Sequence, residues 1–395
     1  MKKVLVLNGS FCEIPIIQEC HKLGYYVVTT GNMPDLIGHK YADEYIKADY
    51  SKYEYILEVV QKNNIDHILT CANDFGSITA SYVDEQMGWN CHDSFSNAQL
   101  LHHKDLFKTY IQGKGFPTPY SKVFTNRNEA VDFINRKAKL PVIIKANDLT
   151  GGKGIMKATS KEEALVGIDN AFSKSRSKHI LIEPYIIGNQ QTFVSFLHNK
   201  RVIACSSCDS YSYINPYLIQ AETLPAKDIK DIQNELISII EGIASDLNLY
   251  DGIFAFQYIR NGDDFQIIEM MRRPFGNQFL HLVELNSGFP WHHAQIVAET
   301  GGDWSFLDKI DIHPSVKYCG HYGVMIERNG KLKRFYIPPS IQKHLINKFI
   351  MKNIGDTIDD HLNERVAFLH YQYDSYDEMV NDVRHYMDQI VVEVE

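Results

Sequence analysis

Short apolar runs alternate with helically spaced apolar residues over the first part of the chain. Residues 4–7, 26–29 and 67–70 form the runs, which predict buried strands. Between them, apolar residues recur every three or four positions, which predicts helices. Strand, helix and strand in succession predict a parallel sheet. The residues at helical spacing are Ile14, Ile17, Cys20 and Leu23, then Tyr53, Leu57 and Val60.

A second block extends from about residue 117 to 188 and has its own strand pattern. A helical stretch at 96–115 leads into the Pro-containing residues 116–119, which predict a boundary. Strands are expected at 141–145 and 178–182, with a loop at 147–154 between them. This arrangement predicts a small α/β unit.

Hairpins and one long helix are expected in the remaining two hundred or so residues. Turn signals at 198–200 and at the Asn-Gly pair 261–262 predict two hairpins. A helix over 229–247 has its apolar residues on one face. A boundary is expected near 304–314, before a final unit. The expected strands are 193–197, 201–205, 253–259, 265–270, 320–327 and 332–337, with a last helix through 376–387.

Composition excludes some classes of function. The 395 residues carry a net charge of −9, and nucleic-acid binding proteins need clustered Lys and Arg instead. No apolar run is long enough for a membrane span, and the N-terminal apolar run stops at Asn8, unlike a signal peptide. We therefore expect neither a nucleic-acid partner nor a membrane partner.

The seven cysteines are an odd number scattered along the chain. This pattern favours reduced thiols and a cytoplasmic location over a disulfide framework. Cys205 and Cys208 form a C-x-x-C pair, for which zinc or redox chemistry is the alternative. No further ligands at a suitable spacing follow, so buried neutral cysteines are the preferred interpretation.

The first segment with candidate chemistry is a strand that ends at Lys145 and is followed by a glycine-rich loop. Gly151, Gly152 and Gly154 carry no side chains, so backbone N–H groups there can surround phosphate oxygens, helped by Lys153. The loop lacks the Walker pattern. A plain turn is the alternative interpretation.

The second segment places Glu183 at the end of a strand, before a short linker that contains Tyr185 and Ile186. Linker backbone groups can bind an adenine edge, and the Glu183 carboxylate can accept from the adenine amine. A plain domain hinge is the alternative.

The third segment pairs two predicted strands across a hairpin. Gln257 and Glu269 can project to the same face of the adjoining strands, where a carboxylate can hold Mg²⁺ against a triphosphate. Arg272 and Arg273 follow directly and can stabilise a carboxylate and a developing acyl phosphate. An exposed charged strand end is the alternative.

These three segments, in this order, resemble the ATP-grasp superfamily over nearly the whole chain. Within it, the chain is most similar to proteins like the carbamoyl-phosphate synthase large subunit and to amino-acid ligases. The resemblance extends to residues 39–43 of the N-terminal region, to His103-Lys104-Asp105, and to residues 320–325 and 355–356 near the C-terminus.

The resemblance implies an α/β fold in three parts. Residues 1–98 would form an N-terminal Rossmann-like parallel sheet domain. Residues 99–310 would form an ATP-grasp fold of two α+β subdomains, with a small lid subdomain at about 117–188. Residues 311–395 would form a C-terminal α+β closing region.

The resemblance also implies the site residues and cofactors. ATP and Mg²⁺, with Mn²⁺ as a substitute, would be bound, and small carboxylate and amine molecules would be the substrates. Homodimers are common among such proteins. The implied nucleotide-binding residues are Lys104, Lys145, Gly151, Gly152, Lys153, Gly154, Glu183, Tyr185, Ile186 and Gln190; the metal ligands are Glu269 and Gln257; and the catalytic residues are Arg273 and Arg272.

Three positions depart from the family pattern. Gln190 stands where Glu usually binds the ribose, Gln257 stands where a metal-binding acid is usual, and Met271 stands where Asn is usual. A thioether is a poor Mg²⁺ ligand, so Glu269 is the one charged metal ligand left.

The expected function is an ATP-dependent carbon–nitrogen ligase that joins a carboxylate to an amine through an acyl phosphate. One alternative is a carboxylase or purine-biosynthesis enzyme of the same superfamily. Another is a non-catalytic ATP-binding regulator, which the three departures would favour.

Overall fold

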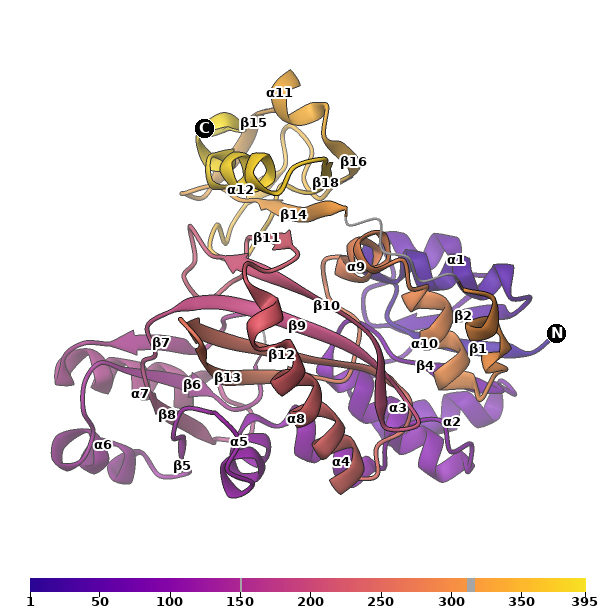
Figure 1. Ribbon diagram of the computed structural model, residues 1–395, viewed down its shortest axis with the longest axis horizontal. Helices are drawn as coiled ribbons and strands as arrows, with labels where there is room; N and C mark the ends of the chain where they lie inside the picture. Colours follow the sequence, from indigo (N-terminus) through magenta and orange to yellow (C-terminus); the bar gives the residue numbers. More distant parts are fainter. Residues whose placement is uncertain (150, 311–316) are drawn as a thin grey trace.

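The computed structural model describes residues 1–149, 151–310 and 317–395. Figure 1 shows four groups of elements: an N-terminal sheet with its helices, a small sheet with α6 and α7, a long central sheet, and a C-terminal group above it. The central sheet has eight strands in the order β13-β12-β9-β10-β11-β14-β18-β16, and it connects the other parts.

The N-terminal sheet is parallel, as expected, with strand order β3-β2-β1-β4. The three predicted strands are confirmed. A fourth, β3, was not predicted because its residues are only half-buried and form no apolar run. The elements are β1 (Lys3–Leu7), α1 (Ile14–Lys22), β2 (Tyr26–Gly31), β3 (Glu44–Lys47), α2 (Tyr53–Lys62), β4 (His67–Leu69) and α3 (Asp74–Met87), with 3-10 turns at Phe11–Glu13 and Ile37–Tyr41.

A helix from much later in the chain completes this unit. α10 (Trp291–Thr300) lies against α1 and β4, and its Ile296 packs among Val4 and Val6 of β1. Almost every residue of α10 is buried, so it has no polar face and no amphipathic pattern. Neither α10 nor the preceding α9 (Phe279–Ser287) was predicted.

His92 forms a buried polar contact between this helix and α3. Its Nδ1 lies 3.3 Å from Asp84 Oδ1, and its Nε2 lies 3.8 Å from Glu299 Oε2 of α10. Burial alone would lower the pKa of His92, but the hydrogen bond with Asp84 and the nearby Glu299 carboxylate raise that pKa to about 9. The charged imidazole therefore contributes to the docking of α10.

We expect this contact to make stability fall as the pH rises. A folded-state pKa above the unfolded value of about 6.5 gives stability that is fully present below pH 6.5 and lost as the pH passes 9. The loss is roughly 3 kcal/mol in the free energy of unfolding. Urea unfolding between pH 6 and pH 9.5 should show it, and His92→Gln should remove most of the slope. The exposed His385→Gln variant should keep it.

The small unit consists of an antiparallel sheet in the order β5-β8-β6-β7 and two helices. Its two predicted strands are confirmed, each displaced by one or two residues. α6 and α7 bury their alanine and isoleucine side chains against this sheet. The elements are β5 (Lys122–Phe124), α6 (Arg127–Arg136), β6 (Val142–Ala146), β7 (Ile155–Ala158), α7 (Lys161–Lys174) and β8 (Ile180–Pro184).

The central sheet contains both predicted hairpins. Arg201 pairs with His198 in the first, and Asn261 pairs with Asp264 in the second. The long helix α8 packs its apolar face on the sheet, as its spacing predicted. The elements are α4 (Phe95–His102), α5 (Lys104–Gly113), β9 (Asn189–His198), β10 (Arg201–Tyr211), β11 (Ala221–Leu224), a 3-10 turn at Ile229–Asp231, α8 (Gln233–Asp246), β12 (Gly252–Asn261) and β13 (Asp264–Met271).

The last part of the chain adds strands β14, β18 and β16 to the central sheet and forms a small sheet in the order β17-β15-β19. The expected boundary at 304–314 lies partly outside the described residues. The predicted helix 376–387 is divided at His385, just as the stretch 96–115 is divided at the extended His103. The elements are a 3-10 turn at Trp304–Lys309, β14 (Tyr318–Val324), β15 (Gly330–Tyr336), α11 (Pro339–Gln342), β16 (Leu345–Ile350), β17 (Thr357–Ile358), β18 (Ala367–Tyr373), α12 (Tyr376–Arg384), α13 (Tyr386–Gln389) and β19 (Val391–Val394).

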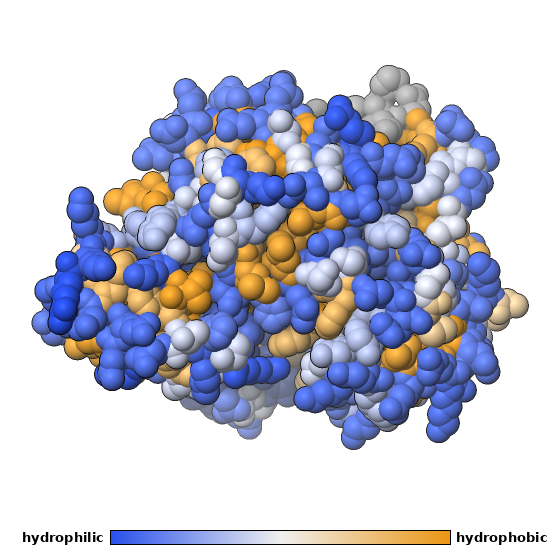
Figure 2. All heavy atoms as spheres, turned by 90° about the horizontal axis from the view of Figure 1, so that it is seen from below, coloured by the Kyte–Doolittle hydropathy of each residue, from blue (hydrophilic) through white to orange (hydrophobic). Residues whose placement is uncertain are grey.

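The face seen in Figure 2 is mainly hydrophilic, with apolar side chains exposed in separate patches. Within the described residues, no helix combines the length and the apolar character needed to cross a bilayer. All seven cysteines are free; Cys208 is buried as expected, whereas Cys205 is only half-buried.

Candidate active site

A cavity of about 640 Å³ lies where the sheets and the N-terminal unit meet. This volume is in the usual range for sites of small molecules and cofactors. Strands β6, β8, β12 and β13 line one part, and residues from β11, β14 and β18 line another. The predicted site residues that line it are Lys104, Lys145, Gly151, Gly152, Glu183, Tyr185, Ile186, Gln190, Gln257, Glu269 and Arg273.

Two of the predicted phosphate-binding lysines each pair with a carboxylate. Lys104, in the first turn of α5, lies 2.9 Å from Glu269 Oε1 and donates to the Leu149 carbonyl at 3.0 Å. Lys145 of β6 lies 2.7 Å from Glu183 Oε2. A predicted metal ligand and a predicted phosphate ligand are thus already in contact.

Glu183 lies at the centre of a buried polar group. Its carboxylate accepts from Lys145 and Ser121 and lies 3.3 Å from Lys108 Nζ. Burial alone would raise the pKa of Glu183, but Lys108 and Lys145 hold it at about 2. Burial lowers the pKa of Lys108 to about 8. The Glu183 carboxylate therefore has three protein partners.

Lys108 and Ser121 were not among the expected site residues. Lys108 lies one helical turn after Lys104, so the spacing of the two lysines along the helix 96–115 was a usable signal. Ser121 follows a proline-rich boundary and gave no signal.

Gln257 and Glu269 are directly opposite each other on β12 and β13, as the hairpin predicted. The Gln190 amide donates to Gln257 Oε1 at 3.4 Å. Met271 also lines the cavity, two residues beyond Glu269 on the same strand. The oxygen donors that could hold a metal ion here are one carboxylate and one amide.

The two arginines after β13 separate. Arg273 lines the cavity, pairs with Asp74 at the start of α3, and donates to the Pro274 carbonyl at 2.9 Å. Burial alone would raise the pKa of Asp74, but the Arg273 guanidinium holds that pKa well below its usual range.

Arg272 does not reach the cavity, contrary to the expectation that it acts beside Arg273. Its guanidinium lies 2.8 Å from Asp93 Oδ2 and donates to the carbonyls of Ile253 and Tyr250. The Arg272 contacts join β12 to the segment after α3.

The glycine loop meets the cavity through Gly151 and Gly152. Both have positive φ angles, +66° and +75°, and a Cβ on Gly152 would lie 2.6 Å from the Tyr217 carbonyl oxygen. Glycine is therefore required at Gly152 for conformation and for space. Lys153 is exposed and Gly154 is buried; neither lines the cavity, and Thr150 lies outside the described residues.

The end of the cavity near the C-terminal strands contains residues that the sequence did not reveal. They come from β14, β18, the residues just before β18 and the segment after β13, which are far apart in the sequence. Lys157 of β7 was also missed; its ammonium lies 4.0 Å from the centre of the Tyr185 ring. Glu222 ends the loop 211–222, which was expected to form a wall of the substrate site; the missed residues at the C-terminal end are Asn277, His321, Arg365 and Phe368.

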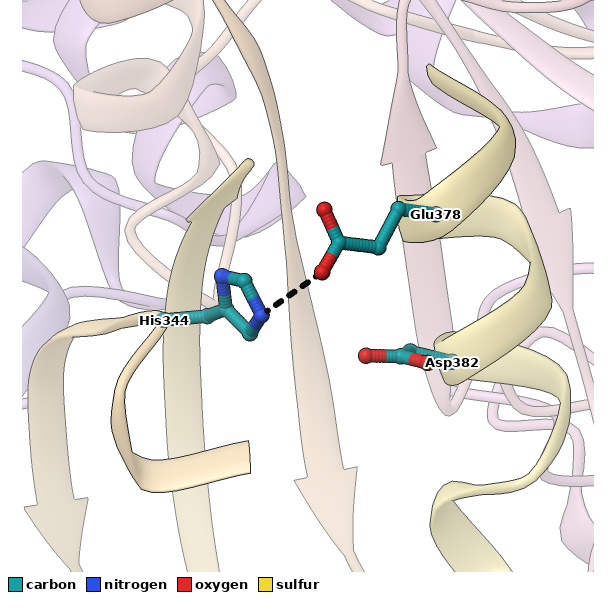
Figure 3. A group of neighbouring side chains, drawn as sticks. All are labelled: His344, Glu378 and Asp382. Atoms are coloured by element: carbon teal, nitrogen blue, oxygen red, sulfur yellow. Dashed lines mark ion pairs between the residues drawn. The ribbon is translucent and has the colours of Figure 1, made fainter. Parts of the chain in front are cut away.

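A separate group of potential metal ligands lies on the C-terminal unit (Figure 3). Ligand atoms of His344, Glu378 and Asp382 all lie within 4.8 Å of one another. Glu378 contacts His344 at 3.3 Å and Lys343 at 3.5 Å, and Asp382 accepts from Tyr373. Since each carboxylate already has protein partners, we interpret this group as an ion-pair cluster.

Comparison with known proteins gives the following similarities. The family described as phosphoribosylglycinamide synthetase, ATP-grasp (A) domain, matches residues 102–216. A phosphoribosylamine–glycine ligase of Ralstonia nicotianae is 27% identical over 174 residues, which cover 39% of this chain and 40% of that protein. A carbamoyl phosphate synthase large chain of Clostridium beijerinckii is 19% identical over 307 residues, which cover 73% of this chain and 28% of that protein.

The fold as a whole is also similar to solved structures. The structure of the L-amino acid ligase from Bacillus licheniformis aligns with 100% of this chain, and the alignment includes 99% of that ligase. The TM-score is 0.83 and the sequence identity is 14%. Residues 102–216 thus match an ATP-grasp (A) domain in sequence, as the resemblance implied, and the chain as a whole shares its fold with the Bacillus licheniformis enzyme.

Proposed function

We propose that the protein is an ATP-dependent carboxylate–amine ligase. The observation that carries the proposal is the composition of the cavity, which brings Lys104, Lys145, Glu269 and Arg273 together around one volume. Three cations and one carboxylate of this kind are suited to a metal-bound triphosphate and to an anionic intermediate. The ATP-grasp fold and the ligases among its relatives support the same conclusion.

The nucleotide would lie between the small unit and the central sheet. Backbone groups of the linker after β8, including Tyr185 and Ile186, would bind adenine, since the Glu183 carboxylate is already bound by Lys145 and Lys108. Gln190 would contact the ribose. We retain the division into 1–98, 99–310 and 311–395 as part of this proposal.

The donor set at β12 and β13 fits a hard divalent ion. Glu269 and Gln257 offer oxygens from adjacent strands, which suits Mg²⁺ or Mn²⁺, whereas the Met271 thioether does not. The ion would neutralise triphosphate charge. Lys104, now paired with Glu269, would then be free to contact phosphate oxygens.

The reaction follows from this placement. A carboxylate oxygen attacks the γ-phosphorus of ATP, and the bond to the ADP oxygen breaks, giving an acyl phosphate and ADP. The amine nitrogen then attacks the acyl carbon and releases phosphate, with loss of one proton from the nitrogen. Arg273 holds the negative acyl phosphate, and Asp74 fixes its guanidinium in the cavity.

A non-catalytic ATP-binding regulator is the second candidate. The Gln190 to Gln257 hydrogen bond and the Met271 side chain favour it. Gln190 and Gln257 are uncharged where the family usually has acids, and Met271 is a thioether where the family usually has Asn. A carboxylase or purine-biosynthesis enzyme of the superfamily is a variant of the main proposal. The Ralstonia relative is a phosphoribosylamine–glycine ligase, but the match covers only 40% of its length.

A screen of carboxylic acids against amines, with ATP and Mg²⁺, tests the proposal through phosphate release. The ligase predicts release that needs both an acid and an amine. Release with ATP alone would contradict the scheme. Nucleotide binding without release for any pair would favour the regulator.

Replacing Met271 by Asn should restore a metal ligand. We expect Met271→Asn to lower the Mg²⁺ concentration for half-maximal turnover about tenfold, since one added oxygen ligand strengthens ion binding. Initial rates over a Mg²⁺ titration measure this. Met351→Asn, at an exposed methionine outside the cavity, is the matched control. An unchanged Mg²⁺ requirement would show that Met271 does not face the ion.

Seven free thiols are typical of a reducing compartment, so the proposal includes a cytoplasmic location. The substrates would be small carboxylates and amines. A homodimer is the association state that the resemblance suggests.

A further inference from the structure

Arg365 is a cation of the cavity that lacks a carboxylate partner within the described residues. It precedes β18 and lines the cavity. Its Nη2 donates to the Ile219 carbonyl at 3.1 Å, and its guanidinium carbon lies 5.1 Å from the centre of the Phe368 ring. Its Nε is buried without any hydrogen-bond acceptor. By contrast, Lys104, Lys145 and Arg273 each pair with a carboxylate.

Among the described residues, no carboxylate forms an ion pair with Arg365, and the Glu222 carboxylate in the same end of the cavity is already paired with His321. The nearby titratable group is the Cys12 thiol, and burial raises the pKa of Cys12 far above neutral, so the thiol stays uncharged. Burial also lowers the pKa of Arg365 to about 10, which still leaves the guanidinium charged at pH 7. A buried charge without a partner is costly, so an anion bound from outside would stabilise it.

The fold makes room for this guanidinium. A Cβ on Gly323 of β14 would lie 2.8 Å from Arg365 Nε and 3.0 Å from its Cδ. The φ angle of Gly323 is not positive, so the glycine is required for space and not for backbone conformation. Arg365 therefore lies against the bare backbone of β14, in a position that a side chain at residue 323 would block.

A carboxylate–imidazole pair, formed by Glu222 and His321, lies on the same face of β14 as Gly323. His321 is two residues before Gly323, so the two face the same side at a spacing of about 7 Å. His321 Nδ1 lies 2.9 Å from Glu222 Oε2, and the Asn277 amide donates to the same oxygen at 3.1 Å. Glu222 and His321 are both buried, and all three residues line the cavity.

This end of the cavity thus has a cation that lies against Gly323 and a carboxylate–imidazole pair at His321, two residues earlier on the same face of β14. A guanidinium is suited to a carboxylate, which it can bind with two parallel hydrogen bonds. Cys208 and Ser210 lie at one Glu222 oxygen, and Asn277 and His321 lie at the other. A carboxylate oxygen can accept more than one hydrogen bond, so the pair still offers acceptors to an amino group. An α-amino acid carries both groups on one carbon.

We propose that this end of the cavity binds an α-amino acid as the amine substrate, with Arg365 holding its carboxylate and the Glu222–His321 pair receiving its amino group. The inference rests on the proposed ligase function and names the nucleophile of that reaction. Arg365 keeps the carboxylate of this amino acid away from the γ-phosphate. Its amino group first gives a proton to the Glu222–His321 pair. The amino nitrogen then attacks the acyl carbon and displaces phosphate, and the product retains a free carboxylate.

The test compares amino acids with their carboxamides as amine substrates. Glycine and the common L-amino acids, each beside its carboxamide, are supplied with the carboxylic acids of the screen, and ADP release gives kcat and KM. For wild-type protein we expect the KM of the preferred amino acid to be at least about 30-fold below that of its carboxamide. This comparison uses unaltered protein, so no folding defect can affect it.

Variants assign the effect to Arg365. Arg365→Met should raise the KM for the amino acid by about the same factor and leave the KM for the carboxamide within about threefold. Arg365→Lys, which keeps the charge, should recover part of the loss. Arg334→Met removes an exposed arginine paired with Glu393 outside the cavity and should change neither value. Equal KM values for acid and carboxamide in wild type, or an Arg365→Met variant that discriminates like wild type, would overturn the inference.

A binding measurement separates this inference from the proposed function. Thermal stabilisation by the same amino acids, without ATP, reports binding alone, and ribose 5-phosphate and inorganic phosphate are the alternative anions. Stabilisation by an amino acid that Arg365→Met abolishes would support the inference even if no ligation occurred. Stabilisation by the phosphates and by no amino acid would overturn it. Ligation that proceeds equally with carboxamides would preserve the ligase and reject the role of Arg365.

Discussion

Glu269→Gln is expected to lower Mg²⁺-dependent ligation about 1000-fold, which corresponds to roughly 4 kcal/mol of transition-state stabilisation. The other carboxylates that line the cavity have different partners: Glu183 pairs with lysines and Glu222 pairs with His321. Glu269 is therefore the carboxylate that we propose holds the metal ion. The Gln side chain keeps the volume and one oxygen but loses the charge that both the ion and Lys104 require.

The measurement is the initial rate of phosphate release with a substrate pair from the screen, over a range of Mg²⁺ and Mn²⁺ concentrations. Glu393→Gln makes the same chemical change in an exposed ion pair outside the cavity and should leave the rate unaltered. A Glu269→Gln variant with more than about a tenth of the wild-type rate at saturating Mg²⁺ would show that another group holds the ion.

Glu183→Gln should be the most destabilising single change in the small unit. It leaves Lys108 and Lys145 without their shared carboxylate in a buried region, and breaking such a group costs about 3–5 kcal/mol. Chemical denaturation at pH 7 measures the loss. Asp169→Asn, in the exposed ion pair with Arg127 of the same unit, should have little effect. Equal free energies of unfolding for the two variants would mean that the buried Glu183 carboxylate adds no more stability than an exposed ion pair.

The Glu183 carboxylate also predicts that the free energy of unfolding falls in acid. The pKa of Glu183 in the folded protein, about 2, is below the unfolded value of about 4.3, so its contribution is fully present above pH 4.3. The contribution is lost as the pH falls through 2. The difference in unfolding free energy between wild type and Glu183→Gln should therefore shrink between pH 4.3 and pH 2.

Patterns within short stretches of sequence gave most of the fold. The N-terminal strands, both hairpins and α8 follow from runs and spacing that involve only neighbouring residues. Two of the elements that were missed, β3 and α10, depend on pairing or packing with other segments. β3 is only half-buried and becomes a strand by pairing with β2, and α10 has no polar face because α1 and β4 cover it.

The candidate site shows the same division. Gln257 and Glu269 could be paired from sequence because one hairpin fixes their register. The end with Arg365 and His321 could not, since it forms only when β11, β14 and β18 pair. Sequence also could not show which of Arg272 and Arg273 points into the cavity. That choice depends on Asp93 and Asp74, which lie about 180–200 residues earlier.

The transfer of oxygen tests the central claim most directly. With the carboxylate substrate labelled with ¹⁸O in both oxygens, ATP and the amine are supplied in a single turnover, and the released phosphate is analysed by mass spectrometry. An acyl-phosphate ligase must leave one carboxylate oxygen on the phosphate, so we expect phosphate that carries one ¹⁸O atom. Phosphate without the label would contradict the account, because the γ-phosphoryl group would then have passed to water or to another acceptor.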